Sequence, residues 1–211
     1  MSFYRDEAAL ALKRREVYGV FDSLDIPYKV FDHEPIFSAA DRADKQVVVD
    51  GLICKNLFLR NKEKSRYYLY TLPIDKRADL LALQKKLGES RLSFGDADML
   101  WEMLRVAPGF VSLLNIIGAH NKAEDGIDGN NSYQNVDPNF NNEIESFQGK
   151  DPLLQTRENW KGLKLLIDKD TLDVPGIGLH PNDNAATIVF AANMIPILLE
   201  RYGADFMFIE L

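Results

Sequence analysis

The sequence predicts an α+β domain built around a mixed β-sheet. Several short apolar or alternating runs are typical of strands, their spacing along the chain is uneven, and the helical segments between them differ in length. A regularly wound fold would alternate strands and helices at an even spacing, which this chain lacks. With 211 residues, of which 46% are hydrophobic, the chain can bury a full core, and the simplest organisation is one domain over residues 1–211.

The first part of the chain predicts a helix, a strand and a short second helix. Residues 6–24 place apolar side chains at the spacing of one buried helical face. Pro27 ends this helix, and residues 28–32 form an expected strand. Ser38 then begins a capping pattern that predicts the start of a short helix.

The run at residues 52–60 predicts the central strand, and a polar turn separates it from a second strand at residues 66–72. Both faces of the first strand are mostly apolar, so we expect burial on both sides. Lys55 and Asn56 interrupt this pattern, and a buried ammonium must find partners or lose its proton. Two interpretations remain open: the two side chains line a cleft, or the lysine stem reaches the edge of the sheet.

The rest of the chain continues the mixed pattern. Residues 75–87 and 96–104 predict helices, the first closed by Gly88, and residues 110–117 predict a strand or a strand-like loop. The later segments are a strand at 163–168, a turn at 175–178, a strand at 185–191, a helix at 193–202 and a strand at 205–211.

Residues 121–159 differ from the segments around them. They contain eight asparagines and little apolar periodicity, with eight acidic residues against three basic ones. Long stretches without structure are uncommon in compact domains, so we interpret this segment as a polar, acidic insertion.

Composition excludes several classes of protein. The single cysteine, Cys54, cannot form an intramolecular disulfide, and neither a secretory leader nor a membrane-spanning apolar run is present. We therefore expect a soluble, cytoplasmic protein with no membrane partner. The net charge of -7 argues against broad nucleic-acid coating but allows a local basic surface. A phosphate-binding glycine loop, a cysteine and histidine metal cluster and a serine nucleophile elbow are all missing, so no metal or cofactor is expected.

A second polar group lies late in the chain. His180-Pro181-Asn182-Asp183-Asn184 stands immediately before the apolar strand at 185–191. A satisfied turn and a binding site are both open interpretations of this pattern. The residues alone thus lead to an α+β domain with a candidate Lys, Asn and His cleft.

Two motifs carry a resemblance to a known family. Lys55-Asn56-Leu57-Phe58-Leu59-Arg60 and the late His180-Pro181-Asn182-Asp183-Asn184 occur in the order seen in the YbaK family of aminoacyl-tRNA editing domains. Arg91-Leu92-Ser93-Phe94 and Pro108-Gly109 lie between them in the same order. The resemblance covers nearly the whole chain except the insertion, and it is closest to the freestanding prolyl-tRNA editing proteins that hydrolyse Ala-tRNA(Pro). It implies a mostly antiparallel, partly barrel-like sheet surrounded by helices.

The resemblance also implies a site and a reaction. Lys55, Asn56 and His180 match catalytic positions, and the matching substrate-binding positions are Gly109, Phe110, Val111, Ser112, Leu113, Asn182 and Asn184. The implied reaction is attack of a positioned water on the aminoacyl ester, aided by a ribose hydroxyl and by backbone groups of the loop. A pocket sized for alanine would exclude the proline ring. The implied partners are the acceptor end of aminoacylated tRNA(Pro) and prolyl-tRNA synthetase, with no cofactor.

One departure from the family pattern bears on specificity. Leu113 stands where the family loop generally carries a proline, which changes the size and rigidity of the expected pocket. Asn56 after the lysine favours the alanine type, since cysteine-editing relatives usually have threonine there. The alternatives are a Cys-tRNA(Pro) deacylase and a noncatalytic module of the same fold that binds tRNA or a synthetase.

Overall fold

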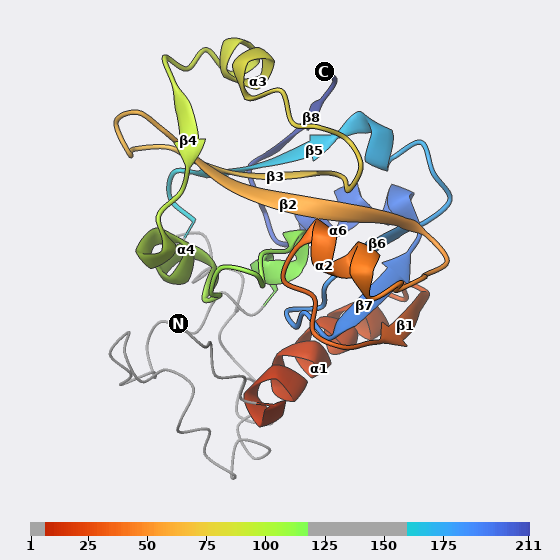
Figure 1. The fold of residues 1–211 in the computed structure, drawn as a ribbon. Helices are drawn as coiled ribbons and strands as arrows, with labels where there is room; N and C mark the ends of the chain where they lie inside the picture. The colour runs from red at the N-terminus through yellow and green to blue at the C-terminus, as the bar shows by residue number, and fades with distance from the viewer. Residues whose placement is uncertain (1–6, 118–159) are drawn as a thin grey trace.

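The computed structural model describes residues 7–117 and 160–211 (Figure 1). Its strands are β1 (Tyr28–Asp32), β2 (Leu52–Asn61), β3 (Tyr67–Pro73), β4 (Leu92–Phe94), β5 (Leu163–Asp168), β6 (Ile177–Leu179), β7 (Ala186–Phe190) and β8 (Phe206–Ile209). The strands form one sheet in the order β1-β7-β6-β2-β3-β5-β8, with β4 paired to β2. The insertion expected at 121–159 lies outside the described residues.

Helices accompany this sheet, which confirms the predicted α+β class. The α-helices are α1 (Glu7–Ser23), α2 (Ala39–Asp44), α3 (Leu80–Leu87), α4 (Ala97–Leu104) and α6 (Ile195–Arg201), and the 3-10 helices are η1 (Leu113–Ile116), η4 (Lys169–Thr171) and η5 (Ala192–Met194). Within the described ranges, no helix combines the length and hydropathy needed to cross a bilayer.

The sheet is mixed, and β2 is its central strand. Antiparallel pairing joins β1 to β7, β7 to β6, and β2 to both β3 and β4. Parallel pairing joins β2 to β6, β3 to β5, and β5 to β8. Figure 1 shows β3, β5 and β8 on one side of the long β2 and β6, β7 and β1 on the other. The two parts of the sheet therefore meet near the start of β2, where Ile53 pairs with β6 and Cys54 pairs with β3.

Two cores pack against opposite faces of the central strands. Leu69 on β3 is fully buried in the larger core, to which α1, α4 and α6 contribute, whereas Leu72 is fully buried in the smaller core with α3. On β2, Phe58 belongs to the larger core and Leu59 to the smaller one. Two-sided burial was predicted for this strand, and it is confirmed at these positions.

Local capping explains where several helices begin and end. The Ser38 side chain accepts a hydrogen bond from the backbone of Asp41, which caps α2 as predicted. Asp79 accepts from the backbones of Leu81 and Ala82, so α3 begins after Asp79, later than the predicted residue 75. Gly88 ends α3 with a left-handed φ of 67°, a conformation that favours glycine.

Besides β4, which was not predicted as a strand, two segments differ from the prediction. Residues 110–117 do not form a strand; η1 occupies the second half of this stretch, because the Ser112 and Asn115 side chains form a capping box with the local backbone. The predicted turn at 175–178 contains the start of β6, which exists through pairing with β2 and β7. Both differences arise from contacts that local apolar patterning does not encode.

Candidate active site

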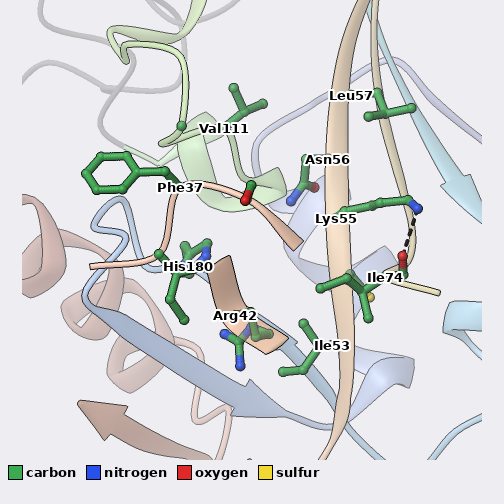
Figure 2. A pocket seen from close by; sticks show the side chains of 13 residues that line it. Phe37, Arg42, Ile53, Lys55, Asn56, Leu57, Ile74, Val111 and His180 are labelled. Carbon is green, nitrogen blue, oxygen red and sulfur yellow. Dashed lines mark hydrogen bonds between the residues drawn. The ribbon is translucent and has the colours of Figure 1, made fainter. Parts of the chain in front are cut away.

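A cavity of about 280 Å³ opens beside the middle of β2. Its lining comes from separate parts of the chain: positions within 36–42, residues 53–57 of β2, Ile74, the loop around Gly109, and His180 (Figure 2). These segments are distant in sequence, and the sheet brings them together. The polar groups among them determine what the cavity can bind.

The Asn56 carboxamide has a fixed orientation. Its Oδ1 accepts hydrogen bonds from the Thr71 hydroxyl at 2.8 Å and from the Leu113 backbone N–H at 3.1 Å. Because a backbone N–H can only donate, the atom that faces it must be the amide oxygen. The Nδ2 group is then left as a donor that has no acceptor within the part of the chain that is described. Figure 2 shows the Asn56 carboxamide directed from β2 into the cavity.

Lys55 lies at the edge of the same cavity, but its side chain turns the other way. Its Nζ donates to the Ile74 carbonyl at 2.7 Å, and Figure 2 shows it pointing away from His180. The predicted cleft therefore exists between Lys55 and His180, while the ammonium rests on a backbone carbonyl. This single hydrogen bond contributes only modestly to stability.

The loop opposite β2 approaches the cavity at Gly109. This residue has a φ of 92°, and a Cβ here would lie 3.1 Å from the Phe37 ring. Glycine thus allows both the backbone conformation and the close approach. The Phe37 ring is 48% exposed at the cavity rim and meets the Phe110 ring edge to face, with 6.2 Å between their centroids.

His180 supplies a neutral imidazole to the cavity. Its Nδ1 lies 2.8 Å from the Ala186 carbonyl, and because a carbonyl can only accept, Nδ1 carries the proton. Burial, with a smaller contribution from the positive charge of Arg42, lowers the pKa of His180 to about 4. The imidazole is therefore uncharged near neutral pH, and its Nε2 is an acceptor.

A series of hydrogen-bonded polar residues that the sequence did not reveal adjoins His180. Arg42 Nη2 donates to the Thr187 hydroxyl at 2.8 Å, and this hydroxyl in turn lies 2.9 Å from His33 Nε2. The His33 ring meets the His180 ring edge to face, with 5.9 Å between their centroids. Arg42 is buried and forms no ion pair among residues 7–117 and 160–211, so it leaves a positive charge at the cavity lining.

Little in the sequence could have indicated these hydrogen-bonded residues. Arg42 belongs to a short, highly polar helix and resembles an ordinary surface charge. His33 follows the predicted strand at 28–32 and belongs to neither of the two motifs that indicated the site. The antiparallel pairing of β1 with β7 places His33 next to Thr187, so a correct prediction of that pairing would have found the contact.

The cavity gathers some of the predicted site residues and not others. Lys55, Asn56, Gly109, Val111 and His180 line it. The remaining predicted positions, all buried, do not line the cavity; they are Phe110, Ser112, Leu113, Asn182 and Asn184. Leu113 nevertheless contributes its backbone N–H to Asn56. Across the described residues, no group of three or more His, Cys, Asp or Glu side chains is arranged to hold a metal ion.

The chain is similar to proteins described as aminoacyl-tRNA editing proteins. A family model described as "Aminoacyl-tRNA editing domain" matches residues 33–125, which include Lys55, Asn56 and Gly109. The chain is similar to the "Prolyl-tRNA editing protein ProX" of Acetoanaerobium sticklandii, with 26% identity over 94% of this chain and 97% of that protein. It is also 30% identical to the mouse "Prolyl-tRNA synthetase associated domain-containing protein 1", over 49% of this chain and 62% of that protein.

The fold is also found among solved structures. A crystal structure described as a candidate trans-editing enzyme for prolyl tRNA synthetase aligns with a TM-score of 0.54 at 18% identity. The alignment covers 92% of this chain and 94% of that one. At this identity the likeness establishes the shared fold alone.

Proposed function

Because this chain belongs to the aminoacyl-tRNA editing domain family of the YbaK type, we propose that it is a hydrolase that removes alanine from mischarged Ala-tRNA(Pro). The acceptor end of the tRNA binds at the cavity beside β2, and the aminoacyl group enters between β2 and the loop at Gly109. The observation that carries the proposal is the Asn56 carboxamide, whose oxygen is bonded within the protein and whose Nδ2 faces the cavity.

The reaction needs no protein nucleophile. A water molecule attacks the ester carbonyl carbon, the bond from that carbon to the ribose oxygen breaks, and the proton from the water passes to the ribose oxygen. Free alanine and an intact 3′ end result. In this scheme Asn56 Nδ2 donates to the carbonyl oxygen as negative charge develops there, which stabilises the transition state over the ground state.

His180 and Lys55 have different parts in this scheme. His180 Nε2 accepts a hydrogen bond from the attacking water or from the ribose hydroxyl, a role that suits a neutral imidazole. The Lys55 ammonium exchanges the Ile74 carbonyl for a phosphate or carbonyl oxygen of the RNA end, which is a charge-assisted and therefore stronger partner.

Selectivity against proline is steric. In this proposal the sorting surface is the cavity wall that contains Gly109 and Val111, which admits a methyl side chain and excludes the larger pyrrolidine ring. Apolar contact distinguishes one methylene by only about 1–3 kcal/mol, so exclusion by size gives a stronger discrimination than affinity does. A correctly charged Pro-tRNA(Pro) is thereby spared.

Deacylation of Ala-, Cys- and Pro-tRNA(Pro) tests this function. The wild type should release alanine rapidly and proline slowly, and Lys55→Ala should show a large defect. Lys29→Ala is the matched control, because Lys29 also lies within a strand but pairs with Asp50 at the surface. Preferred release of cysteine would reassign the substrate, and tight tRNA binding without any deacylation would favour a noncatalytic module.

A further inference from the structure

Two buried asparagines, Asn115 and Asn182, join the loop of the cavity to the segment that carries His180. We propose that this pair, here called the amide clasp, positions the loop that sorts substrates, with Asn115 as the central positioning residue. The inference rests on the proposed deacylase function and adds to it the part of the molecule that sets selectivity. Neither side chain lines the cavity; their exposed fractions are 1% and 3%.

Asn115 holds the loop from within. Its Oδ1 accepts from the Ser112 backbone N–H at 2.6 Å, and its Nδ2 donates to the Phe110 carbonyl at 3.3 Å. These bonds close the turn between Gly109 and η1. Two loop residues line the cavity. Val111 lies between the bonded residues Phe110 and Ser112, and Gly109 immediately precedes Phe110. The clasp therefore fixes the backbone of both.

The second half of the clasp crosses to the other segment. Asn115 Nδ2 donates to Asn182 Oδ1 at 2.8 Å, and Asn182 Nδ2 donates to the Ile117 carbonyl at 2.8 Å. The Ser112 N–H can only donate and the Ile117 carbonyl can only accept, so both ends of the chain fix the orientation of the two amides. Asn182 lies two residues after His180. The bond between Asn115 and Asn182 therefore holds the loop at a fixed distance from the His180 imidazole.

The clasp gives rigidity that the loop sequence does not supply. Leu113 leaves the backbone angle free where a proline would restrict it, but its N–H bonds Asn56. Asn56 thus holds the loop from the cavity side, and Asn115 holds it from the core. A buried polar network of this kind stabilises one arrangement when every member is satisfied, and loses it when one member is removed.

Removal of Asn115 should therefore alter substrate sorting as well as rate. We expect Asn115→Ala to lower kcat/KM for Ala-tRNA(Pro) by about 10- to 100-fold, because small displacements of a catalytic site have effects of this size. The ratio of alanine to proline release should fall at the same time, since a loosened loop no longer excludes the larger ring. A purely structural asparagine would lower the melting temperature and leave this ratio unchanged.

Asn182→Gly provides an independent variant. Asn182 has a φ of 60°, which glycine adopts freely, so this substitution removes the amide without straining the backbone. In a double-mutant cycle the combined variant should be no worse than the more defective single variant, because both substitutions break one network. If the decreases in kcat/KM of the two single variants multiply in the combined variant, the two asparagines act independently, and the clasp does not act as a unit.

Tyr70→Phe is the matched control for lost buried hydrogen bonding. Tyr70 donates to the buried Asp168 in the smaller core, and neither residue lines the cavity. We expect this variant to lose stability and to keep the wild-type selectivity. An equal loss of selectivity in Tyr70→Phe would contradict the proposal.

Amide hydrogen exchange separates the clasp from the proposed function. The Leu113 N–H should exchange faster in both asparagine variants and at the wild-type rate in Tyr70→Phe. Faster exchange in a protein that deacylates nothing would refute the hydrolase and retain the clasp. Unchanged exchange and selectivity in an active enzyme would refute the clasp alone.

Discussion

The two walls of the cavity are built in contrasting ways. The wall formed by the loop at Gly109 and by His180 is bonded to its surroundings: the amide clasp holds the loop, and the Ala186 carbonyl holds the imidazole. Across the cavity, the Lys55 ammonium rests on one carbonyl. Phe37, half exposed at the rim, lies against the loop at Gly109. The fixed wall suits discrimination by size, and the adaptable side suits capture of a flexible, charged RNA end.

Asn56 joins the two walls, and its removal should have the largest effect. Asn56→Ala deletes the donor that faces the cavity and frees the Leu113 N–H, so we expect kcat/KM for Ala-tRNA(Pro) to fall by about 10²- to 10³-fold, as for loss of an oxyanion donor. Steady-state deacylation measures this. Thr71→Val removes only the hydroxyl bonded to Asn56, so it should lower kcat/KM much less. Equal defects in the two variants would show that the orientation of the Asn56 carboxamide accounts for the whole effect.

Lys55 should have the next largest effect, through binding. We expect Lys55→Ala to lower kcat/KM by about 10- to 100-fold, the range of a hydrogen bond to a charged group, mostly by raising KM. If the ammonium contacts phosphate, the dependence of log kcat/KM on log salt should flatten by about 0.7 to 1 in the variant. A wild-type salt slope in Lys55→Ala would place the ammonium away from the RNA backbone.

The substitution Leu113→Pro sharpens the comparison within the fixed wall. Ser112 is extended, with ψ at 153°, and Leu113 begins η1, so the backbone accepts proline there. Proline stiffens the loop but removes the N–H that bonds Asn56. Loss of one net hydrogen bond predicts a decrease in alanine release of about 2- to 10-fold, measured by kcat/KM. An increase would mean that loop rigidity outweighs the orientation of Asn56.

The pH dependence should be the smallest effect near neutrality. His180 has a pKa of about 4, below its ordinary 6.5, so deacylation should be insensitive to His180 protonation from pH 8 to 5 and fall only toward pH 4. The unfolded state then binds the extra proton, so the stability due to neutral His180 is complete above pH 6.5 and is lost as the pH falls toward 4. A pH–rate profile with a His limb near 6.5 would contradict this assignment.

Local sequence patterns predicted most of the longer elements but not the arrangement around the cavity. The strands β1 and β5 match their predicted bounds because their apolar patterns are local. The 3-10 helix at Leu113–Ile116 depends on the Ser112 and Asn115 side chains, and β6 depends on strand pairing, so neither follows from periodicity. Single-domain organisation over residues 1–211 stays a prediction.

The same limit applies to the site residues. The unusual placement of Lys55 and Asn56 in an apolar strand indicated a cleft, and the cavity beside β2 is the finding that answers it. Sequence could not reveal that Lys55 turns toward Ile74, because side-chain direction depends on partners outside the strand. Arg42 is a similar case, since its burial depends on tertiary packing against Thr187.

The most direct test of the account is a crystal structure with a nonhydrolysable analogue, 3′-alanylamino-3′-deoxyadenosine. The account predicts that the alanyl methyl group packs against Gly109 and Val111 and that Asn56 Nδ2 lies within hydrogen-bond distance of the carbonyl oxygen. An analogue bound outside the cavity, or one whose carbonyl oxygen turns away from Asn56, would contradict it.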